Sequence, residues 1–273
     1  MLIEDNEMLR RFVPNIVNEV HGEKSLYDKI SVFLEQSENF VREKLLGEEV
    51  YNDIHSMTNI LTLARSVVAF DAIFNAIPSL DLVLTPNGFG VVNNSNIAPA
   101  SADRVKNLQL QYEKSRDTAI FNLINYLYEL KEWRKSYCAR YFLATLIPTS
   151  NLAEIVGEYT HQWERYDALR AKVISFEFEI AEKYISHELM EELRQGIALD
   201  PYLSHVKGIL QNYVIKKLAD VEGRIYLDSH LKHAVNYMLA NIEQFPTWKA
   251  SQQYLKFNPV LFKNKKSNGG YWS

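Results

Sequence analysis

Two pairs of histidine and glutamate in this sequence have spacings that metal-binding helices use. His187 begins a His-Glu pair, but Glu191 stands where a His-Glu-x-x-His zinc helix has its second histidine. Glu158 and His161 have the Glu-x-x-His spacing of di-iron bundles, which need two such motifs and two further glutamates. Both sets are incomplete. We therefore expect no metal site, and we interpret His187 as part of a helix-capping turn.

The sequence also lacks the loops and nucleophiles that common enzyme families share. Gly88 and Gly90 do not form a dinucleotide-binding loop, because the third glycine and the helix that should follow are missing. A P-loop and a Gly-x-Ser-x-Gly elbow are absent as well. Cys138, the single cysteine, lies among aromatic residues and is interpreted as a buried hydrophobic residue in a reducing compartment. The sequence predicts neither an enzyme nor a bound cofactor.

The elements that would position any site belong to a globular protein of ordinary composition. Of its 273 residues 47% are hydrophobic and 23% charged, and the net charge is -4. This balance argues against specific nucleic-acid binding, and the lysines near the C-terminus are interpreted as a solvated tail. No signal-peptide pattern is present, and the most apolar stretch, 60–77, contains Arg65, Asp71 and Asn75. We expect that stretch to be a buried helix and expect no membrane contact.

Helical periodicity runs through most of the chain, which predicts a mainly α fold built as a helical bundle. Ser25 and Asp28 form a capping-box pattern at the first strong helix, which Gly47 ends. Ser101 is a candidate N-cap of the long third helix. The predicted helices cover about 25–47, 49–77, 102–130, 135–146, 163–185, 186–198, 202–219 and 229–244.

One long interruption separates the second and third predicted helices. The β-like runs 82–85 and 89–92 flank Pro86-Asn87-Gly88, which is turn chemistry suited to a hairpin. A protruding β-hairpin is therefore predicted near 82–93. Because an isolated two-stranded hairpin is marginally stable, it must lean on helices or on another chain. Asn87, Gly88, Phe89 and Gly90 are the candidate assembly contacts.

A weak internal repeat suggests how the chain is divided. Residues 27–50 align without a gap to residues 166–189, and six positions coincide. These are Tyr27 with Tyr166, Asp28 with Asp167, Glu38 with Glu177, Glu43 with Glu182, Lys44 with Lys183 and Glu49 with Glu188. Two amphipathic helices can converge on Glu and Lys because both suit helix surfaces, so convergence and duplication both stay open. Duplication predicts two tandem helical units, 1–148 with the hairpin and 158–250.

The last residues, 251–273, are predicted to form an extended C-terminal arm. Phe262, Tyr271 and Trp272 lie in it, and aromatic side chains in an extended arm favour burial against a partner. They complete the set of candidate assembly contacts. A disordered tail is the alternative interpretation of the same residues.

Three stretches of the sequence carry a resemblance to a known family. These are 80–92 with 96–105, the opening run 12–15 with 22–29, and 141–148. They resemble a family of functionally uncharacterised proteins that phages and prophage-like elements of gut anaerobes encode. The resemblance implies a gene among virion-assembly genes and supplies no catalytic motif. A small helical unit with a protruding strand pair also looks like the head-tail connector proteins of tailed phages, which is an argument from fold alone.

These observations together predict a structural protein of the virion, present in host cytoplasm during assembly. We expect a head-tail connector or neck component that forms a homo-oligomeric ring and contacts portal or tail proteins. The alternative is a soluble helical adaptor or regulatory protein that binds one partner through its hairpin. An enzyme whose site is assembled from distant residues comes third.

Overall fold

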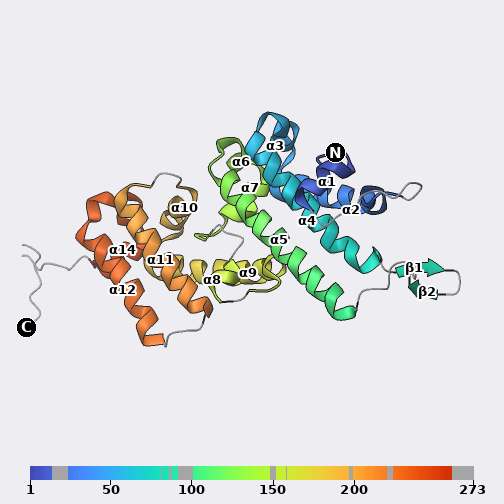
Figure 1. The fold of residues 1–273 in the computed structure, drawn as a ribbon. Helices are drawn as coiled ribbons and strands as arrows, with labels where there is room; N and C mark the ends of the chain where they lie inside the picture. The colour runs from blue at the N-terminus through green and yellow to red at the C-terminus, as the bar shows by residue number, and fades with distance from the viewer. Residues whose placement is uncertain are drawn as a thin grey trace, which may run out of the picture. The chain divides into compact units, whose positions relative to one another are not determined.

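The structure is a computed structural model of the whole chain, which describes residues 1–13, 24–80, 82–85, 88–91, 101–147, 152–157, 159–196, 199–219 and 224–259. For the two strands and for residues 224–227 it describes the backbone alone. The described part is mainly helical, as predicted (Figure 1). By its contacts the chain divides into two compact units, Met1–Ala171 and Lys172–Ser273.

The first unit contains the longest helices. In chain order its elements are α1 (Asn6–Phe12), α2 (Leu26–Phe40), the π-helix η1 (Val41–Leu46), α3 (Glu48–Asn52), the 3-10 helix η2 (Ile54–Ser56), α4 (Thr58–Leu80), β1 (Leu82–Thr85), β2 (Gly88–Val91), α5 (Ala102–Tyr128), α6 (Lys131–Lys135), α7 (Tyr137–Leu143) and α8 (Leu152–Ile155). It also includes the first half of α9 (Gln162–Ile180).

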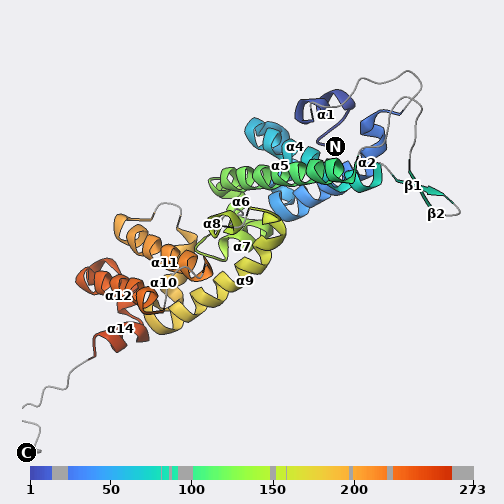
Figure 2. The same ribbon diagram turned by 60° about the horizontal axis from the view of Figure 1, so that its bottom comes forward.

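The core of this unit is α4, which packs between α2 and α5. Figures 1 and 2 both show α4 and α5 side by side. Among the described helices, Thr58–Leu80 is long and apolar enough to cross a membrane by length and composition. Its buried residues include Ala64, Val68 and Ala72, whose small side chains allow neighbouring helices to approach closely. This packing accounts for its apolar character.

Local sequence signals explain several helix ends. The Ser25 hydroxyl accepts the backbone N–H of Asp28, and the Asp28 carboxylate accepts the backbone N–H of Ser25, so the predicted capping box is confirmed. Gly47 ends η1 with φ +79°, a conformation that favours glycine. Ser101 occupies the N-cap position of α5 but makes no capping hydrogen bond with its side chain.

The strands β1 and β2 occupy the place where the sequence predicted a hairpin. They pair antiparallel, with Leu82 opposite Val91 and Thr85 opposite Gly88. Gly88, Phe89 and Gly90 belong to β2, whereas Asn87 lies outside the described residues. The protrusion of this segment and its assembly contacts stay predictions.

Several of the predicted helix boundaries were wrong. The helix predicted over 49–77 is divided into α3, η2 and α4, because the chain turns to bury Val50 and Ile54. The helix α4 also continues through Pro78, which lies in its last turn. The helix predicted over 135–146 is divided at Ser136, whose side chain caps α7. The helix predicted from 229 begins already at Arg224.

The second unit is a smaller set of helices. After the second half of α9 come the π-helix η3 (Ala181–Ile185), α10 (His187–Gln195), α11 (Pro201–Ala219), α12 (Arg224–Ala240), the 3-10 helix η4 (Ile242–Gln244), α13 (Pro246–Lys249) and α14 (Gln252–Phe257). The helices α11 and α12 pack against each other. Glu177, fully buried, accepts hydrogen bonds from Nε and Nη2 of Arg194 at 2.9 and 2.8 Å.

The division of the chain differs from the predicted one at both boundaries. The units meet within α9, after Ala171, whereas the sequence suggested a boundary between 148 and 158. The reason is that the first half of α9 packs its aromatic residues on the first unit. Residues 252–257, predicted to lie in an extended arm, form the helix α14, which packs against η3.

Candidate functional site

The π-helix η1 ends in carbonyl groups that side chains from α6 and α7 satisfy. The backbone N–H of Gly47 donates to the carbonyl oxygen of Arg42 at 2.9 Å, and the indole Nε1 of Trp133 donates to that of Leu45 at 2.6 Å. The Cys138 thiol donates to the carbonyl oxygen of Glu43 at 3.1 Å. Carbonyls at a helix end need such partners when they are buried. The contacts fix α6 and α7 against the end of η1.

The second unit makes the same three contacts at η3. The backbone N–H of Ser186 donates to Ala181 at 3.0 Å, and the indole Nε1 of Trp248 donates to Tyr184 at 3.0 Å. In place of the thiol, Nε2 of Gln253 donates to the carbonyl oxygen of Glu182 at 3.3 Å. The alignment of 27–50 with 166–189 pairs each of these acceptors with the corresponding acceptor in η1. The pairs are Ala181 with Arg42, Tyr184 with Leu45 and Glu182 with Glu43.

The repeat therefore extends to the helices that close each unit. Residues 133–142 align without a gap to residues 248–257. The identical pairs are Trp133 with Trp248, Ser136 with Ser251 and Phe142 with Phe257. Ser136 and Ser251 each accept the backbone N–H of the residue three positions later, at 3.1 and 3.2 Å. Convergence on helix-surface residues does not account for buried indole contacts at matched positions. Duplication of a helical unit predicts such matched contacts, and it stays a prediction.

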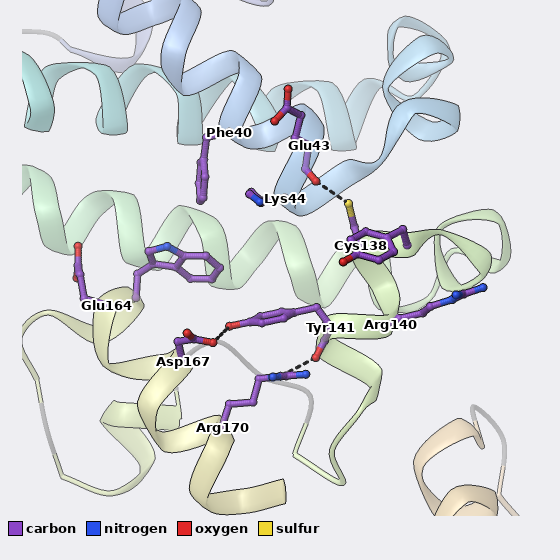
Figure 3. A pocket seen from close by; sticks show the side chains of 11 residues that line it. Phe40, Glu43, Lys44, Cys138, Arg140, Tyr141, Glu164, Asp167 and Arg170 are labelled. Atoms are coloured by element: carbon purple, nitrogen blue, oxygen red, sulfur yellow. Dashed lines mark hydrogen bonds between the residues drawn. The ribbon is translucent and has the colours of Figure 1, made fainter.

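A pocket of about 630 Å³ lies where α9 meets η1 and α7 in the first unit (Figure 3). Its aromatic lining comes from Phe40, Tyr137, Tyr141 and Trp163. Its charged lining consists of Glu43, Lys44, Arg140, Glu164, Asp167 and Arg170. Aromatic residues and arginine, which both line this pocket, are enriched at protein–protein interfaces.

Aromatic packing holds the first half of α9 in place. Trp163 meets Phe40 edge to face, with the ring centroids 5.7 Å apart. Tyr166 stacks on Phe142 at 6.0 Å and on Trp163 at 5.8 Å. Tyr166 and Phe142 are almost fully buried. The Tyr166 hydroxyl has no hydrogen-bond partner among the residues that the structure describes. Tyr166 therefore contacts Phe142 and Trp163 through ring packing alone.

Polar contacts join the same helices beside the stack. The Tyr141 hydroxyl donates to Oδ1 of Asp167 at 2.6 Å, and Nε of Arg170 donates to the carbonyl oxygen of Tyr141 at 2.8 Å (Figure 3). The Arg170 guanidinium also lies 4.0 Å from the centroid of the Tyr141 ring. Burial, followed by the hydrogen bond to Asp167, raises the pKa of Tyr141. The phenol stays protonated and remains a donor.

A buried ion-pair network stands at the start of α9. Arg116, only 4% exposed, contacts Asp117 and Glu164 through Nη2 at 2.9 and 2.8 Å, and Nη1 lies 3.8 Å from Asp71. Oδ2 of Asp117 accepts the backbone N–H groups of Gln162 and Trp163. Burial raises the pKa of Asp71 and of Asp117. The network connects α4, α5 and α9 at one point.

One group of side chains in the described part of the chain could hold a metal ion, and it consists of Glu113, His161 and Glu164. Their ligand atoms lie within 4.8 Å of one another, and Nδ1 of His161 is 2.5 Å from Oε1 of Glu113. A histidine and two carboxylates are acceptable ligands for a divalent transition metal. However, Oε1 of Glu164 accepts a hydrogen bond from Arg116. We assign the group to the ion-pair network. Glu158, the other member of the Glu-x-x-His pattern, lies outside the described residues.

Cys138 has the environment of a structural residue. Its side chain is 5% exposed, and burial raises the pKa of the thiol. A thiol with a raised pKa is a poor nucleophile at neutral pH. The predicted burial of Cys138 is confirmed, even though the residue also lines the pocket.

The assembly contacts predicted from the sequence are not part of this pocket. Phe262, Tyr271 and Trp272, like Asn87, lie outside the described residues. Sequence reasoning missed the pocket and the network around Arg116. One signal was available for the pocket, because Tyr166 and Asp167 are two of the six residues that the repeat shares.

Comparison with known proteins gives a family and no function. Neither the curated proteins nor the solved structures contain a match to the chain. The model of the family of unknown function DUF6712 matches residues 16–142 and 222–258, which is more than half of the chain. The matched residues include η1 with Trp133 and Cys138 in the first unit and Trp248 with Gln253 in the second. The protein belongs to the DUF6712 family.

Proposed function

We propose that this protein is a structural component of a phage or prophage virion, a head-tail connector or neck protein that assembles into a homo-oligomeric ring. The observation that carries the proposal is the way in which its helices are joined. The first helix of the second repeat, α9, docks on the end of α2 and on α7 of the first unit through a stack of aromatic rings. A surface that joins repeats within a chain is also suited to join copies of the chain.

Two further features support an assembly role. The resemblance of residues 80–92, 96–105 and 141–148 points to genes of virion assembly. The strands β1 and β2 connect the two longest helices, and an exposed pair of strands can add to a partner's sheet. In this role β1 and β2 contact the portal or tail.

The pocket beside α9 favours one alternative, a helical adaptor that binds a segment of a single partner. Its mixed lining of aromatic and charged residues is suited to a peptide. The two functions predict different locations for the protein. An adaptor is left behind in the soluble fraction, whereas a connector is a stoichiometric part of the particle.

Mass spectrometry of purified particles from the element that encodes this chain tests the proposal. A connector is expected at a fixed copy number relative to the portal protein, after washing in high salt. Absence of the chain from washed particles overturns the structural role and favours the adaptor. Electron microscopy of the purified chain with its portal provides a second readout, which is a closed ring of subunits.

A further inference from the structure

We infer that copies of this chain associate head to tail, with the start of α2 of one copy docking on α14 and the end of α9 of the next. The inference deepens the proposed ring and rests on the same assumption of self-assembly. Its basis is the internal repeat: α2 corresponds to α9, and α14 corresponds to α7. The contact that α9 makes on α7 can therefore be transferred, residue by residue, to a contact between two chains.

The stacked aromatic pair is the centre of the transferred contact. Tyr166 stacks on Phe142 within the first unit, at 6.0 Å. The corresponding residues are Tyr27 in α2 and Phe257 in α14. Phe142 is fully buried under its partner, whereas Phe257 is 38% exposed and Tyr27 is half-buried. Both members of the transferred pair are thus present and incompletely covered.

A polar pair at the edge of the contact is also complementary. The Tyr141 hydroxyl donates to Asp167 at 2.6 Å. Asp28 corresponds to Asp167, and Lys256 corresponds to Tyr141. Both Asp28 and Lys256 are exposed. Within the chain, the neutral Tyr141 hydroxyl faces the Asp167 carboxylate. Between two chains, the Lys256 ammonium group faces the Asp28 carboxylate, and a charged donor gives the stronger attraction.

The third pair replaces an aromatic contact by an ion pair. Trp163 meets Phe40 edge to face within the first unit. The corresponding residues are Lys24 and Glu179, which have opposite charges. Lys24 is exposed, and the Glu179 side chain is 45% exposed and already close to Lys183 and Lys217. All three transferred pairs are thus attractive.

Apolar residues around the three pairs enlarge the surface. Val32, one turn after Asp28 in α2, is 61% exposed. Leu255, next to Lys256 in α14, is 43% exposed. Exposed large apolar residues beside complementary charges are typical of protein interfaces. Arg170 is the exception to the transfer, because Ser31 occupies its place in α2.

The geometry determines the symmetry of the resulting assembly. The two surfaces of the contact are different parts of the chain, α2 on one side and α14 on the other. A contact of this heterologous kind closes into a ring when the rotation between subunits allows it, and otherwise grows into a filament. The smallest closed ring is a dimer in which each copy offers both surfaces to the other. The occupant of the surface on α14 and the end of α9 is a second copy of the chain.

Disulfide trapping between two different full-length variants tests the contact. In a Cys138→Ser background, Tyr27→Cys is made in one chain and Phe257→Cys in another chain of different mass. Mild oxidation of the mixture is expected to give a mixed dimer in at least about tenfold excess over the statistical yield from random collision. Lys29→Cys mixed with Phe257→Cys is the matched control, because Lys29 is exposed on another face of α2.

The outcomes separate this contact from the proposed function. A mixed dimer at the level of the Lys29→Cys control overturns the contact. If the Phe257→Cys thiol is also unreactive toward a maleimide, the surface is already covered within the chain, which overturns the contact as well. Mixed dimers from a chain that is absent from washed particles support the contact and contradict the virion role alone.

Discussion

The indole Nε1 of Trp133 donates a 2.6 Å hydrogen bond to the carbonyl oxygen of Leu45, and both residues are fully buried. Trp248 and Tyr184 repeat this relationship in the second unit at 3.0 Å. In each case the acceptor lies in a π-helix, whose last carbonyls have no partner within the helix. Each tryptophan therefore fills the core and donates a hydrogen bond to a carbonyl group at the end of a π-helix.

Replacing either tryptophan by phenylalanine tests that relationship. Trp133→Phe and Trp248→Phe keep an aromatic ring but leave a buried carbonyl without its donor, which costs about 1 to 3 kcal/mol. We expect a loss of that size for both variants in denaturant unfolding of the full chain. Tyr137→Phe, at a side chain that is 84% exposed, is the control and should change stability by less than about 0.5 kcal/mol. Equal values for all three variants would contradict this role of the two tryptophans.

The two tyrosines beside the pocket should respond in opposite ways to the same substitution. Tyr141→Phe removes a hydrogen bond to the charged Asp167 and is expected to lower the free energy of unfolding by about 1.5 to 3 kcal/mol. Tyr166→Phe removes a buried hydroxyl without a described partner, so it should leave stability unchanged or raise it. Thermal melts of both variants provide the comparison. A large loss from Tyr166→Phe would show that its hydroxyl has a partner.

The buried carboxyl of Asp71 predicts a pH dependence whose sign is fixed. Burial raises its pKa above the ordinary value of 3.8, although Ser37 and Arg116 oppose the shift. As the pH rises, the unfolded carboxyl ionises first, so the stability contributed by protonated Asp71 is present below pH 3.8 and is lost as the pH passes the folded-state pKa. Replacing Asp71 by a residue without a carboxyl group should therefore stabilise the protein more as the pH rises.

Asp71→Asn is the variant that measures this effect. Its unfolding free energy relative to the wild type is expected to rise from acid conditions toward neutrality, measured by urea unfolding at several pH values. Asn122→Ala, at an exposed position in α5, changes no titratable group, so its difference from the wild type should stay constant with pH. A constant difference between Asp71→Asn and the wild type would contradict the raised pKa.

The sequence predicted the helices whose ends depend on local chemistry. Ser25 and Asp28 fix the start of α2 through their own side chains, so the pattern alone was sufficient. The division of residues 49–77 depends on the burial of Val50 and Ile54, which no local pattern encodes. The π-helices depend on distant partners as well, because Trp133 reaches Leu45 from 88 positions along the chain.

The candidate site was harder to predict, for a physical reason. Glu113, Arg116 and Asp117 have the sequence pattern of an exposed helix surface. Contacts with α4 and with the start of α9 are what bury this part of α5. The repeat was visible in 27–50 and 166–189 because no gap interrupts it. Its second part, 133–142 with 248–257, was hidden because the intervening lengths differ and only the carbonyl contacts reveal the match.

Charge reversal across the contact between copies tests the account most directly. Asp28→Lys and Lys256→Asp each place like charges together and are expected to weaken self-association by about tenfold or more in sedimentation velocity over a concentration series. The double variant carries the swapped pair between every two copies, so its association should return toward that of the wild type. Because Asp28 also caps α2, far-ultraviolet circular dichroism must show that every variant is folded. A wild-type chain that associates, with a double variant no better than the single ones, would contradict the head-to-tail contact, as would a wild-type chain that stays monomeric throughout.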